Sequence, residues 1–178
     1  MLHLIIVERG AVPSDYLYYR IPCPWLAVKA VQFLLLYPPS TDRETDSLVQ
    51  ECVKKVMESS AIEPDQYGKP VPEGRKNAYR AILLEMMSLV IAYGSQVEES
   101  LRGKAVKFLG EFILEKDTNV RYLGLDGLAK MAKQYGNSIS ASYVPHIMAQ
   151  LQETDVSIRK RALDVIYISA DADSAQEI

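Results

Sequence analysis

The chain has 178 residues, of which 48% are hydrophobic and 24% charged, a usual composition for a folded domain. Its net charge of −3 excludes a chain-wide basic field, so we expect no nucleic-acid partner. Apolar runs at 4–7 and 31–37 are too short to cross a bilayer, no signal peptide is visible, and Cys23 and Cys52 fit a reducing compartment better than a disulfide framework.

Apolar residues recur at intervals of three and four along most of the chain, which predicts amphipathic helices rather than strands. In chain order we expect one or two helical turns before residue 20, then helices at 25–36, 43–59, 77–93, 97–114, 118–134, 142–151 and 155–169. No sustained alternation of period two, as expected for a strand, appears in the sequence. Residues with capping chemistry precede several of these helices: Thr41 with Glu44, Ser95 with Glu98, Thr118, and Thr154 or Asp155.

Most connections are short, so neighbouring helices are expected to run antiparallel. The exception is 63–74, which holds three prolines and two glycines and is predicted to be an exposed loop. We favour a tolerated insertion there over a partner-binding loop. The apolar start and helical end of the chain suggest a piece of a longer protein.

Two twelve-residue stretches, 117–128 and 155–166, match at a constant offset of 38 residues. Aligned pairs include Asp117 with Asp155, Arg121 with Arg159, and Gly124 with Ala162, and fainter copies begin at Val28-Lys29 and Tyr79-Arg80. A period near 40 residues is typical of an α-solenoid of the HEAT or armadillo kind. We therefore predict an all-α, HEAT/armadillo-like α-solenoid in which 1–178 forms one continuous segment.

The shared positions of this repeat have physical roles. An acid at the helix start offsets free amides and the positive end of the dipole. Asp155 and Arg159 are four residues apart and can pair, which on an exposed helix contributes only about 0.2–0.5 kcal/mol. An arginine bonded to carbonyls or to the next unit's acid would stabilise more. Gly124, and Gly103 with Gly110 one helix earlier, would let a neighbouring helix approach closely.

Chemistry-bearing residues form no recognisable catalytic, cofactor-binding or metal-binding set. His3 and His146 have no second ligand at zinc spacing, and Cys23 has no evident base. Basic residues could instead meet an acidic partner or anionic lipid, although a solvated face is favoured: Lys54, Lys55, Arg75, Lys76, Lys104, Lys107, Lys130, Lys133 and 159–161.

Several stretches carry a resemblance to one family. The segment 15–29, DYLYYRIPCPWLAVK, resembles α-adaptin, which has two tyrosines, two further residues, Pro-x-Pro-Trp-Leu and Val-Lys. The segments TNVRYLGL at 118–125 and DVSIRKRALD at 155–164 are similar to its Thr-Asn-Leu-Arg-Tyr-Leu-Ala-Leu and Asp-Val-Ser-Val-Arg-Gln-Arg-Ala-Val-Asp. The match runs in order from about residue 14 onward.

This resemblance implies a non-enzymatic trunk fragment of a clathrin adaptor, without cofactors, that serves as a scaffold for coat assembly and cargo selection in endocytosis. Its implied partners are a β-type large chain, a medium chain and a small chain, with clathrin and phosphoinositide membrane bound through the rest of the subunit. Its implied place is cytoplasmic, peripheral on the plasma membrane at clathrin-coated pits. No functional residue is carried over, because the family's phosphoinositide cluster, dileucine pocket and hinge motifs have no match here.

Two other classes remain open at this point. A sister adaptin or a coatomer large subunit would share the architecture at a different membrane. A HEAT-repeat nuclear-transport or regulatory scaffold would bind peptides in a concave groove instead. An enzyme is disfavoured, because no nucleophile–base pair or metal set is apparent.

Overall fold

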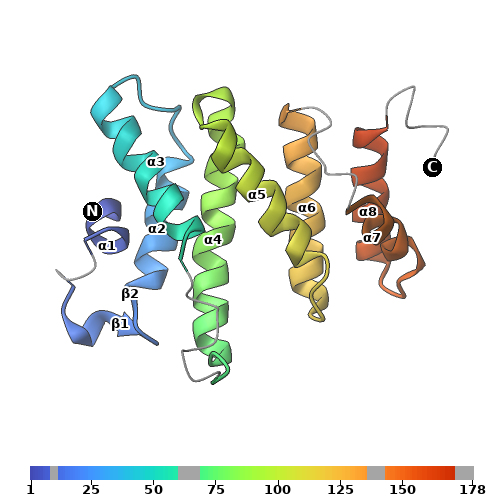
Figure 1. Ribbon diagram of the computed structural model, residues 1–178, viewed down its shortest axis with the longest axis horizontal. Coiled ribbons are helices and arrows are strands. Elements are labelled where there is room, and N and C mark those ends of the chain that lie inside the picture. Colours follow the sequence, from blue (N-terminus) through green and yellow to red (C-terminus); the bar gives the residue numbers. More distant parts are fainter. Residues whose placement is uncertain (9–11, 60–68, 136–142, 171–178) are drawn as a thin grey trace. The chain divides into compact units, whose positions relative to one another are not determined.

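The computed structural model describes residues 1–8, 12–59, 69–135 and 143–170 (Figure 1). The chain divides into two compact units, Met1–Leu101 and Arg102–Ile178. Apart from one very short hairpin, the regular structure of the described residues is helical, so the all-α prediction is confirmed. Helix α5 (Glu99–Phe112) spans the boundary between the units, and each unit is described below by itself.

The first unit is built from four α-helices, α1 (Leu2–Ile6), α2 (Pro24–Leu34), α3 (Arg43–Met57) and α4 (Glu73–Tyr93), with short 3-10 turns η2 (Ser14–Tyr16) and η3 (Gly94–Gln96). Helix α2 packs along α4, while α1 and α4 both contact α3. Among the described residues this core buries no charged residue, and its most deeply buried side chains are Val31, Leu83, Met86, Met87, Leu89 and Val90. Burial of this stripe is what the three-and-four periodicity of the sequence predicts.

A small antiparallel hairpin, which the sequence did not predict, lies in the first unit. Strand β1 (Leu17–Tyr18) pairs with β2 (Ile21–Pro22) around Tyr19 and Arg20, whose φ angles are 48° and 66°. Two consecutive positive φ angles suit the primed turns that usually contain asparagine and glycine. The turn was missed because tyrosine and arginine occupy those positions, at a cost in backbone strain.

Two predicted capping boxes are shifted in the structure. Asp42, rather than Thr41, caps α3, because its carboxylate accepts the Thr45 amide at 2.9 Å. Ser95 lies within η3, and α5 begins only at Glu99, so the pairing of Ser95 with Glu98 predicted the wrong helix start.

The acids of the 38-residue repeat do cap their helices. Asp155 accepts the Ser157 amide at 2.7 Å at the start of α8 (Val156–Ser169). Asp117 accepts the Asn119 amide at 2.8 Å before α6 (Thr118–Tyr135), so the cap is Asp117 and not the predicted Thr118. In both copies a carboxylate therefore satisfies free amides of the first turn.

Helix boundaries otherwise follow the sequence closely, with two differences. Helix α4 begins at Glu73, four residues before the expected position, with Pro72 as its N-cap. The last two residues of the predicted loop 63–74 therefore belong to α4. Residues 63–68 of this loop lie outside the described residues. In its described part, Val71 is buried. The helix expected at 142–151 is α7 (Val144–Ala149) followed by the 3-10 turn η5 (Gln150–Gln152), and residue 142 lies outside the described residues.

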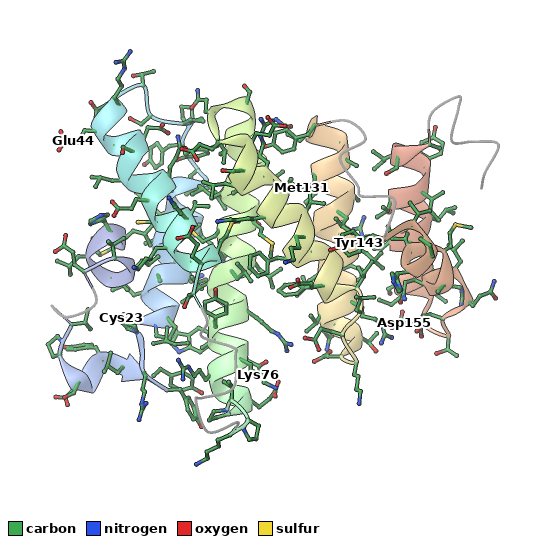
Figure 2. The ribbon with its side chains drawn as sticks, viewed as in Figure 1. Cys23, Glu44, Lys76, Met131, Tyr143 and Asp155 are labelled. Carbon is green, nitrogen blue, oxygen red and sulfur yellow. The ribbon has the colours of Figure 1, made fainter. Side chains whose placement is uncertain are left out.

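Close packing in the second unit depends on glycine. Helix α6 packs along α8, and α7 and η5 contact α8 as well. A Cβ atom at Gly124 would lie 2.9 Å from the Leu109 carbonyl oxygen, and Gly110 lies directly against the ring of Tyr143, which Figure 2 labels. The predicted close approach is confirmed for these two glycines. It is wrong for Gly103, where an added Cβ would meet nothing within 4 Å.

Candidate functional site

The two repeat arginines make the same contact in both copies. The Arg121 guanidinium donates to the carbonyl oxygens of Glu115 and Lys116 at 3.3 and 3.1 Å, six and five residues before it. Thirty-eight residues later, the Arg159 guanidinium donates to the carbonyls at 153 and 154, at 2.7 and 3.0 Å. The shared sequence pattern thus encodes a clamp that fixes the connection entering each helix to that helix.

A carboxylate links the two clamps. The side chain of Glu153 forms an ion pair with Arg121 at 3.3 Å, while its backbone carbonyl accepts from Arg159. The Arg121 side chain is only 15% exposed, so water screens this pair less than a surface pair. The predicted bonding of a repeat arginine to carbonyls and to the acid of the next repeat is therefore confirmed for Arg121. Arg159 was expected to pair with Asp155, but it bonds to the carbonyls of Glu153 and Thr154 instead.

A second polar cluster lies between α6 and α8. Arg161 reaches Asp126 at 3.4 Å and Asp164 at 3.1 Å, and its guanidinium donates to the Tyr122 hydroxyl at 3.2 Å. Lys130 also pairs with Asp126, at 2.7 Å. These contacts raise the pKa of Arg161, chiefly through the Tyr122 hydrogen bond. Arg161, which stands where the earlier copy has Leu123, therefore joins two helices of the fold.

The outer face of α8 differs from the matching face of α6. Leu125 and Ala129 are buried in α6, at 0% and 7% exposure, but their counterparts Leu163 and Tyr167 are 58% and 83% exposed. Val156 adds to the exposed apolar stripe. Repeat positions that are buried in α6 are therefore exposed in α8. An exposed apolar stripe of this kind is typical of a helix surface against which another element packs.

Among the residues that the structure describes, side chains with catalytic potential do not assemble into a reactive set. Hydrogen bonds to Glu51 at 2.9 Å and Glu8 at 3.2 Å raise the pKa of His3 and fix this side chain between α1 and α3. Burial raises the pKa of the Cys52 thiol to about 11, which keeps it protonated and unreactive at neutral pH. His146 lies in the short helix α7, and Cys23 holds the left-handed N-cap of α2.

Within 1–8, 12–59, 69–135 and 143–170, no group of three or more His, Cys, Asp or Glu side chains is placed to hold a metal ion. Over that same part of the chain, no helix combines the length and apolarity needed to cross a bilayer.

Several basic residues are partnered on their own helix surfaces. Lys76 pairs with Glu73 at 3.6 Å, and Lys107 pairs with Glu111 at 3.9 Å. Such exposed pairs contribute little to stability and are typical of a solvated surface. Arg75, next to Lys76, differs from them, because it lines a pocket of the first unit.

Paired helices with a 38-residue period, clamped by arginine and spaced by glycine, define a helical-repeat protein of the HEAT or armadillo type. The chain belongs to the family of the adaptin N terminal region, whose sequence profile matches residues 6–178. The resemblance to adaptins and the fold class expected from the sequence are therefore confirmed.

Curated relatives support the same assignment. The chain is 33% identical over 178 residues to "AP-2 complex subunit alpha-1" of Arabidopsis thaliana, covering 97% of this chain and 17% of that protein. It is 30% identical to "AP-2 complex subunit alpha-2" of Dictyostelium discoideum, over 100% of this chain and 18% of the relative. It is 25% identical to "AP-4 complex subunit epsilon-1" of Mus musculus, over 90% of this chain and 13% of the relative. The chain spans less than a fifth of the length of these relatives.

Proposed function

We propose that this chain is one continuous segment of the helical trunk of an α-adaptin-like large subunit, and that it works as a scaffold without catalysis. The observation that carries the proposal is the family match over 6–178, together with relatives named as α subunits of an AP-2 complex. The arginine clamps support the proposal physically, because in both copies the arginine fixes the start of its helix to the connection before it in the same way. A stack of this kind presents an extended surface on which other subunits can dock.

The partners that we propose are a β-type large chain, a medium chain and a small chain. Together they would form an adaptor complex that selects cargo in endocytosis and vesicle-mediated transport. We place it in the cytoplasm, peripheral on the plasma membrane at clathrin-coated pits. Clathrin and phosphoinositides would be bound by other parts of the subunit. The open apolar stripe on α8 supports a trunk that continues, since Leu163 and Tyr167 occupy repeat positions that are covered in α6.

Affinity purification of the tagged full chain from its own cells tests this proposal. We expect a β-type adaptin, a medium chain and a small chain in near-equal amounts, and fluorescence microscopy should place the tagged protein at coated pits. Recovery of nuclear-transport factors, with no adaptor subunit, would overturn the proposal.

A sister adaptin is the second candidate, favoured by the similarity to the ε subunit of an AP-4 complex. It predicts the same classes of partner but a different membrane. The microscopy separates the two candidates, because a sister adaptin would lie on internal membranes and not at plasma-membrane pits.

A further inference from the structure

A small pocket in the first unit brings together two arginines from distant parts of the sequence. Arg20 comes from the turn of the β1–β2 hairpin, and Arg75 comes from the first turn of α4. The cavity has a volume of about 40 Å³. Its walls are largely apolar and include Ile5, Ile6, Ile21, Pro22, Val56 and Ile82. Figure 2 labels Lys76, next to Arg75 in the sequence, and Cys23, which follows β2 directly.

The pocket contains positive charge without a matching acid. No aspartate or glutamate lines it, and within the described part of the chain neither arginine side chain has a hydrogen bond or ion pair. The Nε atom of Arg75 is buried without a partner. The neighbouring acid Glu73 faces Lys76 and Arg80 instead, at 3.6 and 3.8 Å. A buried cationic nitrogen without an acceptor is costly, and a bound anion removes that cost.

The backbone fixes where the two arginines leave the chain. Tyr19 and Arg20 have positive φ angles, and the Tyr19 ring lies against Gly74, where an added Cβ would be 2.6 Å from Tyr19 Cε2. The strained turn is thereby docked one residue away from Arg75. Strained backbone that brings a charged side chain to a pocket is characteristic of binding sites. The start of the 21-residue helix α4 adds the positive end of its dipole.

We propose that this pocket binds the carboxylate of an aspartate or glutamate, flanked by apolar residues, on a partner protein. Guanidinium groups present planar pairs of donors that match a carboxylate. The volume of about 40 Å³ admits one small charged group. The apolar walls suit the side chains that flank the acid. This inference depends only on the geometry of the first unit, and not on the adaptor assignment.

Nuclear magnetic resonance of the arginine Nε–Hε groups in the full chain tests the site. The probes are acetyl-Leu-Glu-Leu-amide, the same peptide with glutamine in place of glutamate, and inorganic phosphate. We expect the glutamate peptide to shift the Arg75 signal saturably, and the glutamine peptide to bind at least about tenfold more weakly, because it lacks the charge. Arg75→Gln and Arg20→Gln should each weaken the glutamate peptide by about tenfold.

Matched variants keep this test decisive. Arg43→Gln removes an exposed arginine outside the pocket and should leave peptide binding unchanged. Arg75→Lys keeps the charge and the helix, so it should fold even where Arg75→Gln does not, and it should bind more weakly than the native chain. Equal binding of the two peptides, or native affinity in both Arg75 variants, would overturn the proposal. Tighter binding of phosphate than of the glutamate peptide would replace the carboxylate with a phosphate ligand. An adaptor-free purification with intact peptide binding would refute only the proposed function.

Discussion

The contribution of the arginine clamp to stability can be measured at Arg159. Replacement by methionine keeps the apolar stem and removes the bonds to the carbonyls of Glu153 and Thr154, at 2.7 and 3.0 Å. We assign about 1.5 kcal/mol to the half-buried bond and about 0.5 kcal/mol to the exposed one, because bonds from charged groups are strong but water competes at the surface. The free energy of unfolding should therefore fall by about 2 kcal/mol, a loss of about 4–8 °C in melting temperature.

Urea denaturation followed by circular dichroism at the helix band is the assay for this change. The midpoint should fall while the slope stays constant, since the surface exposed on unfolding is nearly the same. Lys160→Met is the matched control: Lys160 is the next residue, is exposed and has no bonding partner among the described residues, so its effect should stay within about 0.5 kcal/mol. If both variants have the same midpoint, the clamp is not a stabilising element and the reasoning fails.

Four further substitutions can be tested with the same denaturation assay. Gly124→Ala should destabilise by about 1–3 kcal/mol through overpacking, whereas Gly103→Ala, on an open helix surface, should stabilise by about 0.5–1 kcal/mol; the same sign for both would contradict the packing. Asp155→Ala should cost about 1 kcal/mol, since it removes the cap of α8, and no loss would mean that another group caps this helix. Because Glu51 raises the pKa of His3 above its ordinary 6.5, stability from this pair is complete below that value and is lost as pH rises through the folded-state pKa. His3→Gln should abolish this pH dependence, and an unchanged profile would refute the link.

Helices and repeat positions were largely readable from the sequence, because both depend on short-range chemistry. The three-and-four spacing predicted the bounds of α2 and α6 to within a few residues. The 38-residue repeat correctly identified Arg121 and Arg159 as equivalent, bonded arginines. Their acceptors were less specific, since carbonyls carry no sequence signature. Only the fold could show that Arg159 bonds its own entering connection and not Asp155.

Features that depend on unusual backbone or on long-range contact were missed. The hairpin at Tyr19 and Arg20 lacks the expected turn residues, so its strain is invisible in a sequence pattern. The pocket joining Arg20 to Arg75 depends on residues more than fifty positions apart, which no local pattern connects. Gly103 shows the opposite error: its spacing from Gly110 suggested helix contact, but it lies on an open surface.

The double use of Glu153 has a consequence for how the second unit comes apart. Its side chain belongs to the contact network of Arg121, and its backbone carbonyl belongs to that of Arg159. If the connection at 153 moves, both arginines lose an acceptor at once, so fraying at the start of α8 also loosens the clamp of α6. Amide hydrogens at the starts of these two helices should therefore exchange with solvent in step, as one opening event.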